Sequence, residues 1–174
     1  TKREFNVNLI LEVLNRRPDY VFQNYASNHF RWKNNFENTF HTNLCLRVSS
    51  KQNSVVSIRI IKFENLVFLD STARPVQLGS NINFFSAIIG KLFKMRSFYL
   101  NTNLVYQTVI KGPDVFGLPE LFTRNSVYWA NSVFKKAMDL QIGFDIIYTS
   151  KYTGLAYQPA LNSFYYQDQK NQGN

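Results

Sequence analysis

The sequence predicts an all-β fold, an antiparallel transmembrane β-barrel of the outer-membrane type, on three observations. Segments of alternating hydrophobicity follow one another along the chain. Short and long breaks alternate between them, as in barrels that turn tightly at one end and loosely at the other. Aromatic residues make up 16% of the chain and charged residues only 18%, which suits strands between lipid and a wet lumen. An aromatic-rich soluble all-β domain is the alternative, because alternation alone does not show which face is covered.

The first two predicted strands cover residues 3–14 and 39–48. In both, apolar and polar side chains alternate, so each strand has one apolar and one polar face. The apolar positions are Phe5, Val7, Leu9, Leu11 and Val13 in the first strand and Phe40, Leu44, Leu46 and Val48 in the second. Arg47 shares the opposite face of the second strand with His41, Asn43 and Cys45, so we expect Arg47 to point into the lumen.

The third and fourth predicted strands cover residues 55–63 and 76–93. The third is apolar on both faces except at Ser57, Arg59 and Lys62. Its sequence therefore does not show which face is turned toward lipid and which toward the lumen. The fourth alternates apolar Val76, Leu78, Ile82, Phe84, Ile88 and Leu92 with polar Gln77, Asn81, Asn83 and Lys91. Soluble sheets usually have strands of about 5–6 residues, so the length of these segments favours a membrane-crossing barrel.

The last three predicted strands cover residues 98–110, 125–134 and 138–148. The first and third of them alternate most regularly, while residues 125–134 are mixed and rich in aromatic side chains. Their apolar positions are Phe98, Leu100, Leu104, Tyr106 and Ile110, and Met138, Leu140, Ile142, Phe144, Ile146 and Tyr148. Phe93, Phe98, Tyr106 and Tyr148 fall toward strand ends, where outer-membrane barrels place girdles of aromatic residues.

The polar faces of these strands predict the lining of a pore. In a barrel, the apolar face is turned toward lipid and the polar face toward the lumen. The predicted pore-lining residues are Arg47, Arg59, Asn101, Asn103, Gln107, Asp139, Gln141 and Asp145. We expect their charge, together with the pore width, to set which solutes pass.

The breaks between strands predict the topology. The short ones lie near residues 49–54, 94–97 and 135–137, and the long ones at about 15–35, 64–75, 111–120 and from 150 onward. In outer-membrane barrels, short turns are periplasmic and long loops extracellular. We therefore expect Thr1 near the periplasmic rim and the long loops on the outside of the cell.

Two of the long loops contain candidate contact residues. Arg16 and Arg17 would bind a sugar acid or a lipid phosphate, although pairing of Arg17 with Asp19 across a Pro18 turn explains the cluster better. The loop at residues 151–167, called the Tyr-rich loop below, contains Tyr152, Tyr157 and Tyr165. These tyrosines either contact glycans and partner proteins or belong to a loop folded on itself across the barrel mouth.

Catalytic, metal and cofactor sites have no support in the sequence. Cys45 is the single cysteine, and the histidines, His29 and His41, have no further ligand at a suitable spacing. Asp139 and Asp145 are about 20 Å apart along an extended strand, too far for paired acid–base work. No G-x-S-x-G elbow or glycine-rich phosphate loop occurs. We therefore expect no enzyme activity and no cofactor.

The net charge of +9 indicates which kinds of partner the protein would attract. The Lys and Arg residues are scattered rather than grouped, which argues against nucleic-acid binding. A scattered positive charge suits contact with anionic lipid at a barrel rim or a pore that attracts anions. No stretch of ~18 apolar residues provides a transmembrane helix, and no signal peptide precedes Thr1, so we expect a mature product or a fragment.

Three segments resemble a known family. The stretches NRRPDYVFQNYASNHFRWKNNF (15–36), LPELFTRNSVYW (118–129) and MDLQIGFDIIYTSKYTGLAYQPALNSFYYQ (138–167) are similar to the putative porins of Bacteroidetes outer membranes. Members of that family are longer, with further strands after the Phe-Tyr segment. The resemblance therefore implies a C-terminal-region fragment, a single partial barrel over residues 1–174 whose strands are missing on both sides.

The resemblance implies a bacterial outer-membrane location and a porin-like barrel for passive or facilitated diffusion of small solutes. The expected partners are outer-membrane lipid and lipopolysaccharide, with other outer-membrane proteins as candidates and no nucleic acid. One alternative is a loop-plugged barrel that serves as a partner or scaffold in a larger outer-membrane complex. A further alternative is a fragment of a TonB-dependent transporter, which would need a plug that the sequence does not show. Another is a soluble nucleic-acid binder, which would show salt-dependent binding.

Overall fold

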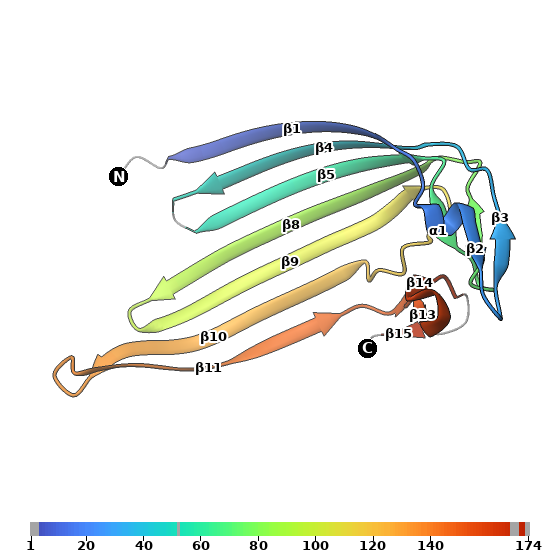
Figure 1. The fold of residues 1–174 in the computed structure, drawn as a ribbon. Coiled ribbons are helices and arrows are strands. Elements are labelled where there is room, and N and C mark those ends of the chain that lie inside the picture. The colour runs from blue at the N-terminus through green and yellow to red at the C-terminus, as the bar shows by residue number, and fades with distance from the viewer. Residues whose placement is uncertain (1–3, 52, 168–170, 173–174) are drawn as a thin grey trace.

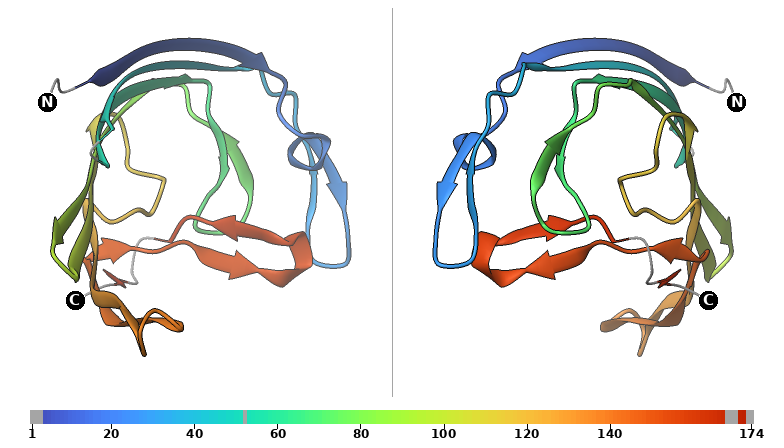
Figure 2. Two further views of the ribbon diagram at one scale, coloured as in Figure 1. Left: turned by 90° about the vertical axis from the view of Figure 1, so that its left-hand side faces the viewer. Right: turned by 90° about the vertical axis from the view of Figure 1, so that its right-hand side faces the viewer.

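The computed structural model describes residues 4–51, 53–167 and 171–172. Its main element is one antiparallel sheet of seven strands in the order β1-β4-β5-β8-β9-β10-β11, curved into an arc (Figures 1 and 2). The strands are β1 (Phe5–Arg16), β4 (Thr39–Ser50), β5 (Ser54–Glu64), β8 (Ile82–Met95), β9 (Phe98–Lys111), β10 (Leu121–Val133) and β11 (Met138–Thr149). Within the described residues, β1 and β11 are the two edges of this sheet and do not pair with each other, so the arc is open.

The connections are sorted by length between the two ends of the sheet (Figure 1). The tight turns β4–β5, β8–β9 and β10–β11 lie at one end, and the long loops at the other. The long loops carry the short elements α1 (Tyr20–Gln23), β2 (Asn24–Ala26), β3 (Arg31–Lys33), β6 (Val67–Leu69), β7 (Pro75–Gln77), β12 (Tyr152–Thr153), β13 (Ala156–Gln158), η1 (Pro159–Leu161), β14 (Ser163–Tyr165) and β15 (Asn171–Gln172). The predicted separation of turns from loops is thus present in the fold.

The two faces of the sheet differ in polarity. Residues paired across antiparallel strands lie on the same face, so the register assigns every position to a side. The convex face is mostly apolar, also in the middle of the sheet, where Ile58 and Ile60 of β5 are 42% and 46% exposed although strands flank them on both sides. Lys91, Thr102 and Asn125 form one polar row across it. The opposite, concave face is the one over which the loops fold (Figure 2). A soluble sandwich would cover such an apolar face with a second sheet.

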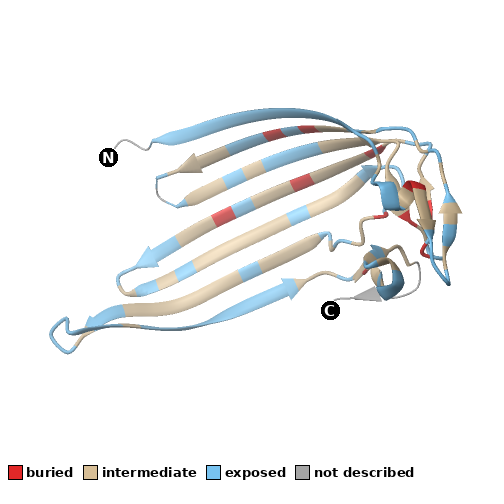
Figure 3. Cartoon of the chain, in the orientation of Figure 1, coloured by how far each residue is buried: buried red, intermediate tan, exposed pale blue. Residues whose placement is uncertain are grey.

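Most buried apolar side chains lie where the loops meet the sheet, and further buried positions lie within β4 and β8 (Figure 3). Ile82 at the start of β8 is fully buried, and Val115 is 9% exposed. In the loop between β9 and β10, Phe116 contacts Phe63 and Phe84, with ring centroids 5.3 and 5.4 Å apart. The loop at 112–120 therefore packs onto the concave face instead of extending away from it.

The seven predicted strands are all present, but the fourth was predicted wrongly in two respects. Residues 76–78 belong to the separate hairpin of β6 and β7, and the sheet strand begins only at Ile82. Its apolar positions Phe84 and Ile88 lie on the concave face, paired with Val109 and Val105, because the inward-folded loop covers that part of the face. Among the described residues, no helix is long and apolar enough to cross a membrane.

Candidate functional site: the concave face of the sheet

The predicted pore-lining residues all lie on the concave face. Cross-strand pairing links Cys45 to Arg59 and Arg47 to Ser57, and it links Asn101 through Ser126 to Asp145. In the same way, Gln107 pairs with Ser86, Asn103 with Gly90, Gln141 with Ala130, and Asp139 with Ser132. The structure thus brings the polar positions of separate strands onto one continuous surface.

Charge is distributed unevenly over this face. Arg47 and Arg59 lie on the neighbouring strands β4 and β5, and both are exposed. Asp139 and Asp145 lie on β11, at the other side of the arc. Arg124 of β10 neutralises Asp145 through an ion pair of 2.6 Å. The β4–β5 side of the concave face is therefore cationic, and the β11 side combines acidic and neutral polar groups.

Two polar side chains of this face are bound to neighbouring segments. Gln107 donates a hydrogen bond of 3.0 Å from its side-chain amide to the carbonyl of Pro119, which attaches the loop at 112–120 to β9. Asn43 donates to the carboxylate of Glu12 on β1 over 3.3 Å. Gln107 was predicted to line the lumen, and its bond to Pro119 shows that it also holds the loop in place.

The sequence interpretation missed an aromatic row across the concave face. Tyr99 of β9 and Tyr128 of β10 are directly paired, and their rings stack with centroids 4.8 Å apart and planes 3° apart. Lys94 of β8 is paired with Tyr99, and Gly143 of β11 with Tyr128. Tyr128 sits in a mixed predicted strand, so only the register of the neighbouring strands could have revealed the row.

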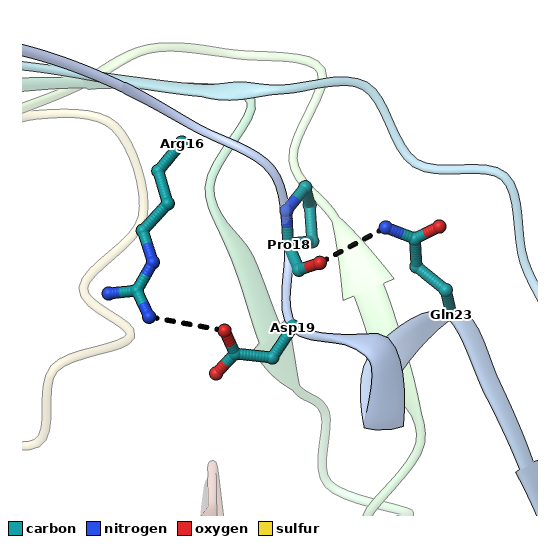
Figure 4. A network of polar contacts seen from close by, with 4 residues as sticks. All are labelled: Arg16, Pro18, Asp19 and Gln23. Atoms are coloured by element: carbon teal, nitrogen blue, oxygen red, sulfur yellow. Dashed lines mark hydrogen bonds and ion pairs between the residues drawn. The ribbon is translucent and has the colours of Figure 1, made fainter.

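The Arg16 cluster is held together by its own contacts. Arg16 Nη2 and Asp19 Oδ1 are 3.2 Å apart, and Gln23 Nε2 donates to the carbonyl of Pro18 over 3.0 Å (Figure 4). The prediction that Asp19 pairs with Arg17 was therefore wrong, because Asp19 pairs with Arg16 instead. Arg16 is the last residue of β1, and its side chain reaches forward to Asp19. Arg17 is exposed and forms no ion pair within the described part of the chain.

The Tyr-rich loop crosses the open side of the arc (Figure 2). It is folded on itself: the Tyr157 hydroxyl and Asn162 Oδ1 are 2.7 Å apart, and Tyr165 pairs with Ala156. It also contacts other loops, since the Tyr25 hydroxyl donates to the carbonyl of Ala160 over 2.8 Å. The predicted contact residues are thus spread along the loop, with Tyr152 in β12 and Tyr157 half exposed.

The hairpin of β6 and β7 is closed by Asp70. One of its carboxylate oxygens accepts hydrogen bonds from the backbone amides of Thr72 and Arg74, at 2.9 and 3.0 Å, and from the Thr72 hydroxyl at 2.7 Å. Partial burial raises the pKa of Asp70, but the hydrogen bonds from Arg74 and Thr72 and the charge of Arg74 outweigh it. The pKa of Asp70 therefore lies below its usual range.

No group of His, Cys, Asp and Glu side chains that could hold a metal ion occurs in the described residues. Cys45 is buried on the concave face, where its sulfur lies 3.4 Å from the Ser57 hydroxyl.

Comparison with known proteins gives a family. A family model described as putative porin matches residues 1–174. No curated protein and no solved structure matches the chain.

Proposed function

We propose that this chain, which belongs to the putative porin family, forms part of the wall of an outer-membrane pore for small solutes. Diffusion through the pore would be passive or facilitated. The observation that supports this most is the distribution of polarity, with apolar side chains exposed on the convex face and polar ones gathered on the concave face. That distribution suits lipid outside and water inside.

The open sheet fits the proposal if further strands close it. Backbone groups at a sheet edge cannot stay unpaired in hydrocarbon, and β1 and β11 both present such an edge. We propose that strands beyond this arc pair with both edges in the complete barrel. Membrane lipid would then surround the convex face, and lipopolysaccharide its outer rim.

Ion selectivity tests the pore. Arg59 and Lys62 lie on the same strand, β5, and the register turns Arg59 to the concave face and Lys62 to the convex face. In a planar bilayer, the complete protein should conduct, and Arg59→Gln and Arg47→Glu should shift its reversal potential toward cation preference. Lys62→Gln removes one positive charge as Arg59→Gln does, and should leave the potential unchanged.

Two results would contradict the pore. One is a folded, inserted protein that does not conduct. The other is an equal shift of selectivity by Arg59→Gln and Lys62→Gln, because the two faces would then not differ in their access to the ions.

The contacts of the Tyr-rich loop favour a second candidate function, a barrel plugged by its loops that serves as a partner in a larger complex. Besides the Tyr25 bond to Ala160, the backbone amide of Tyr166 donates to the carbonyl of Leu69 over 2.9 Å, so this loop is tied to both of the other loop hairpins. Shortening the loop between Gly154 and Phe164 should leave the barrel folded, because surface loops contribute little to strand pairing. A larger conductance would then support the pore, and release of a co-purifying protein without conductance would support the partner function.

A further inference from the structure

We propose that the concave face carries a binding site for a neutral sugar, centred on the side of Tyr128 that faces Gly143. The inference rests on the proposed pore, because it names a class of solute that the pore takes. The site lies on β9, β10 and β11, away from the loops.

The first argument is the direction in which the second ring face of Tyr128 is turned. Tyr99 covers one face of that ring in a nearly parallel stack. Lys94 covers the far side of Tyr99, with its Nζ atom 5.1 Å from the ring centroid. Because β9 lies on one side of β10 and β11 on the other, the second face of Tyr128 is turned toward β11. The position opposite it there is Gly143.

The second argument is that no side chain stands beside the ring at position 143. A Cβ atom at Gly143 would lie 2.4 Å from both the Cβ of Tyr128 and the carbonyl oxygen of Val127, so the backbones approach too closely for a side chain there. An open hollow of about 510 Å³ lies at this place, lined by Tyr128, Gly143 and their neighbours. Its size is within the ~300–1,000 Å³ of small-molecule sites.

The third argument is the chemistry of the rim. Gln141 and Asp145 flank Gly143 on the same face of β11, and Asn101, Ser126, Val127 and Phe144 also line the hollow. These groups offer amide donors, hydroxyl groups and acceptor oxygens around one flat aromatic face. A sugar ring matches this pattern, since its C–H face packs on an aromatic ring and its hydroxyl groups hydrogen-bond at the edges.

The charges at the rim favour an uncharged ligand. The carboxylate of Asp145 is paired with Arg124 at 2.6 Å, so the two charges cancel beside the hollow. An anionic solute would meet the carboxylate of Asp145, and a cationic solute the guanidinium of Arg124. A wholly apolar solute would remove water from Gln141 and Asn101 without giving them partners, which is costly.

The experiment compares two matched tyrosine variants of the complete protein in detergent micelles. Binding of maltotriose is measured by saturation-transfer NMR, with glucuronate and indole as charged and aromatic probes. Tyr128→Leu removes the ring face that is offered to the sugar and should weaken maltotriose binding by about tenfold. Tyr99→Leu removes the other half of the same stack but leaves that face in place, and should change binding by less than about twofold.

A third variant tests the polar rim of the site without changing the stacked rings of Tyr99 and Tyr128. Asp145→Asn preserves the size of the side chain and should weaken maltotriose binding severalfold, and heat-modifiable migration on gels shows whether each variant is folded. Equal binding by the wild type, Tyr128→Leu and Asp145→Asn would overturn the site. Stronger binding of glucuronate or indole than of maltotriose would overturn the assignment to a neutral sugar.

Ion current in a planar bilayer separates this inference from the pore. A protein that conducts but binds no maltotriose refutes the sugar site alone. A protein that binds maltotriose but does not conduct refutes the pore and leaves the binding site standing.

Discussion

Leu104 and Asn103 are consecutive residues of β9 that the register turns to opposite faces. Leu104 is on the convex face, beside Ile89 of β8, and Asn103 is on the concave face, beside Gly90. We expect Leu104→Arg to lower the free energy of unfolding from a bilayer by ~2–4 kcal/mol, since arginine is costly near the midplane of the lipid face. Asn103→Arg should change it by less than about 1 kcal/mol.

The measurement is a denaturant titration of folding into lipid vesicles, followed by tryptophan fluorescence. The two variants differ by one position and introduce the same side chain. Equal costs would show that the convex face does not meet lipid.

The turn held by Asp70 should respond to pH. Its folded pKa is lowered, so its stabilising effect is complete above the ordinary carboxyl pKa and is lost as the pH falls through the lowered value. The protection factors of the Thr72 and Arg74 amides against hydrogen exchange should therefore be high near about pH 6 and fall as the pH drops below the ordinary carboxyl pKa of 3.8. Asp70→Asn, which cannot ionise, should show no such acid transition; a transition of the same size in that variant would exclude Asp70 as its cause.

The face on which a side chain lies could be predicted only where the contrast between the two sides of the sheet alone determines the alternation of apolar and polar residues. In the first half of β9 and along most of β11, apolar and polar residues alternate between the two faces, so Leu104 and Ile146 could be assigned to one face and Asn101 to the other. On β8 the rule failed at Phe84, because Phe116 packs on it from a loop and makes an apolar residue favourable on the concave face. The Tyr128–Gly143 pair could not be predicted, since it depends on the register between two strands.

The order of strands and loops could be predicted from the sequence more reliably than the residues at which each strand begins and ends. The tight turns could be located because Ser, Asn and Lys interrupt the alternation there. The start of β8 was placed too early, because β7 continues the alternating pattern through Val76 although a separate hairpin contains it. Nothing in the local sequence separates a strand of the sheet from a short strand of a loop.

The orientation of the loops can be tested by epitope insertion. Asn28 lies exposed between β2 and β3, at the end of the sheet that carries the long loops, and Lys51 lies in the tight turn between β4 and β5. We expect an epitope at Asn28 to bind antibody on intact cells and one at Lys51 to bind only after permeabilisation. Gly112 is a poorer insertion site, since its φ is +95° and a Cβ there would lie 2.7 Å from the carbonyl of Asn81. The reverse labelling pattern would invert the orientation.

The complete barrel should protect both edges of this arc. All residues of β1 are exposed in the isolated arc, and β9, which has neighbours on both sides, serves as the internal reference. If further strands close the barrel, the amides of β1 and β11 should exchange in the complete protein as slowly as those of β9, because amides paired on both sides of a strand open only with the sheet. Fast exchange along β1 or β11 would mean that the edge stays open.

The sorting of turns and loops also has a consequence for assembly. The pairs β4–β5, β8–β9 and β10–β11 are joined by tight turns, so their contacts are local in sequence, while β1–β4, β5–β8 and β9–β10 must each close a long loop. Loop closure costs more entropy as the loop lengthens, and non-local contacts slow folding. We therefore expect three hairpins to form early, and their joining through the longer connections to limit the rate at which the wall is completed.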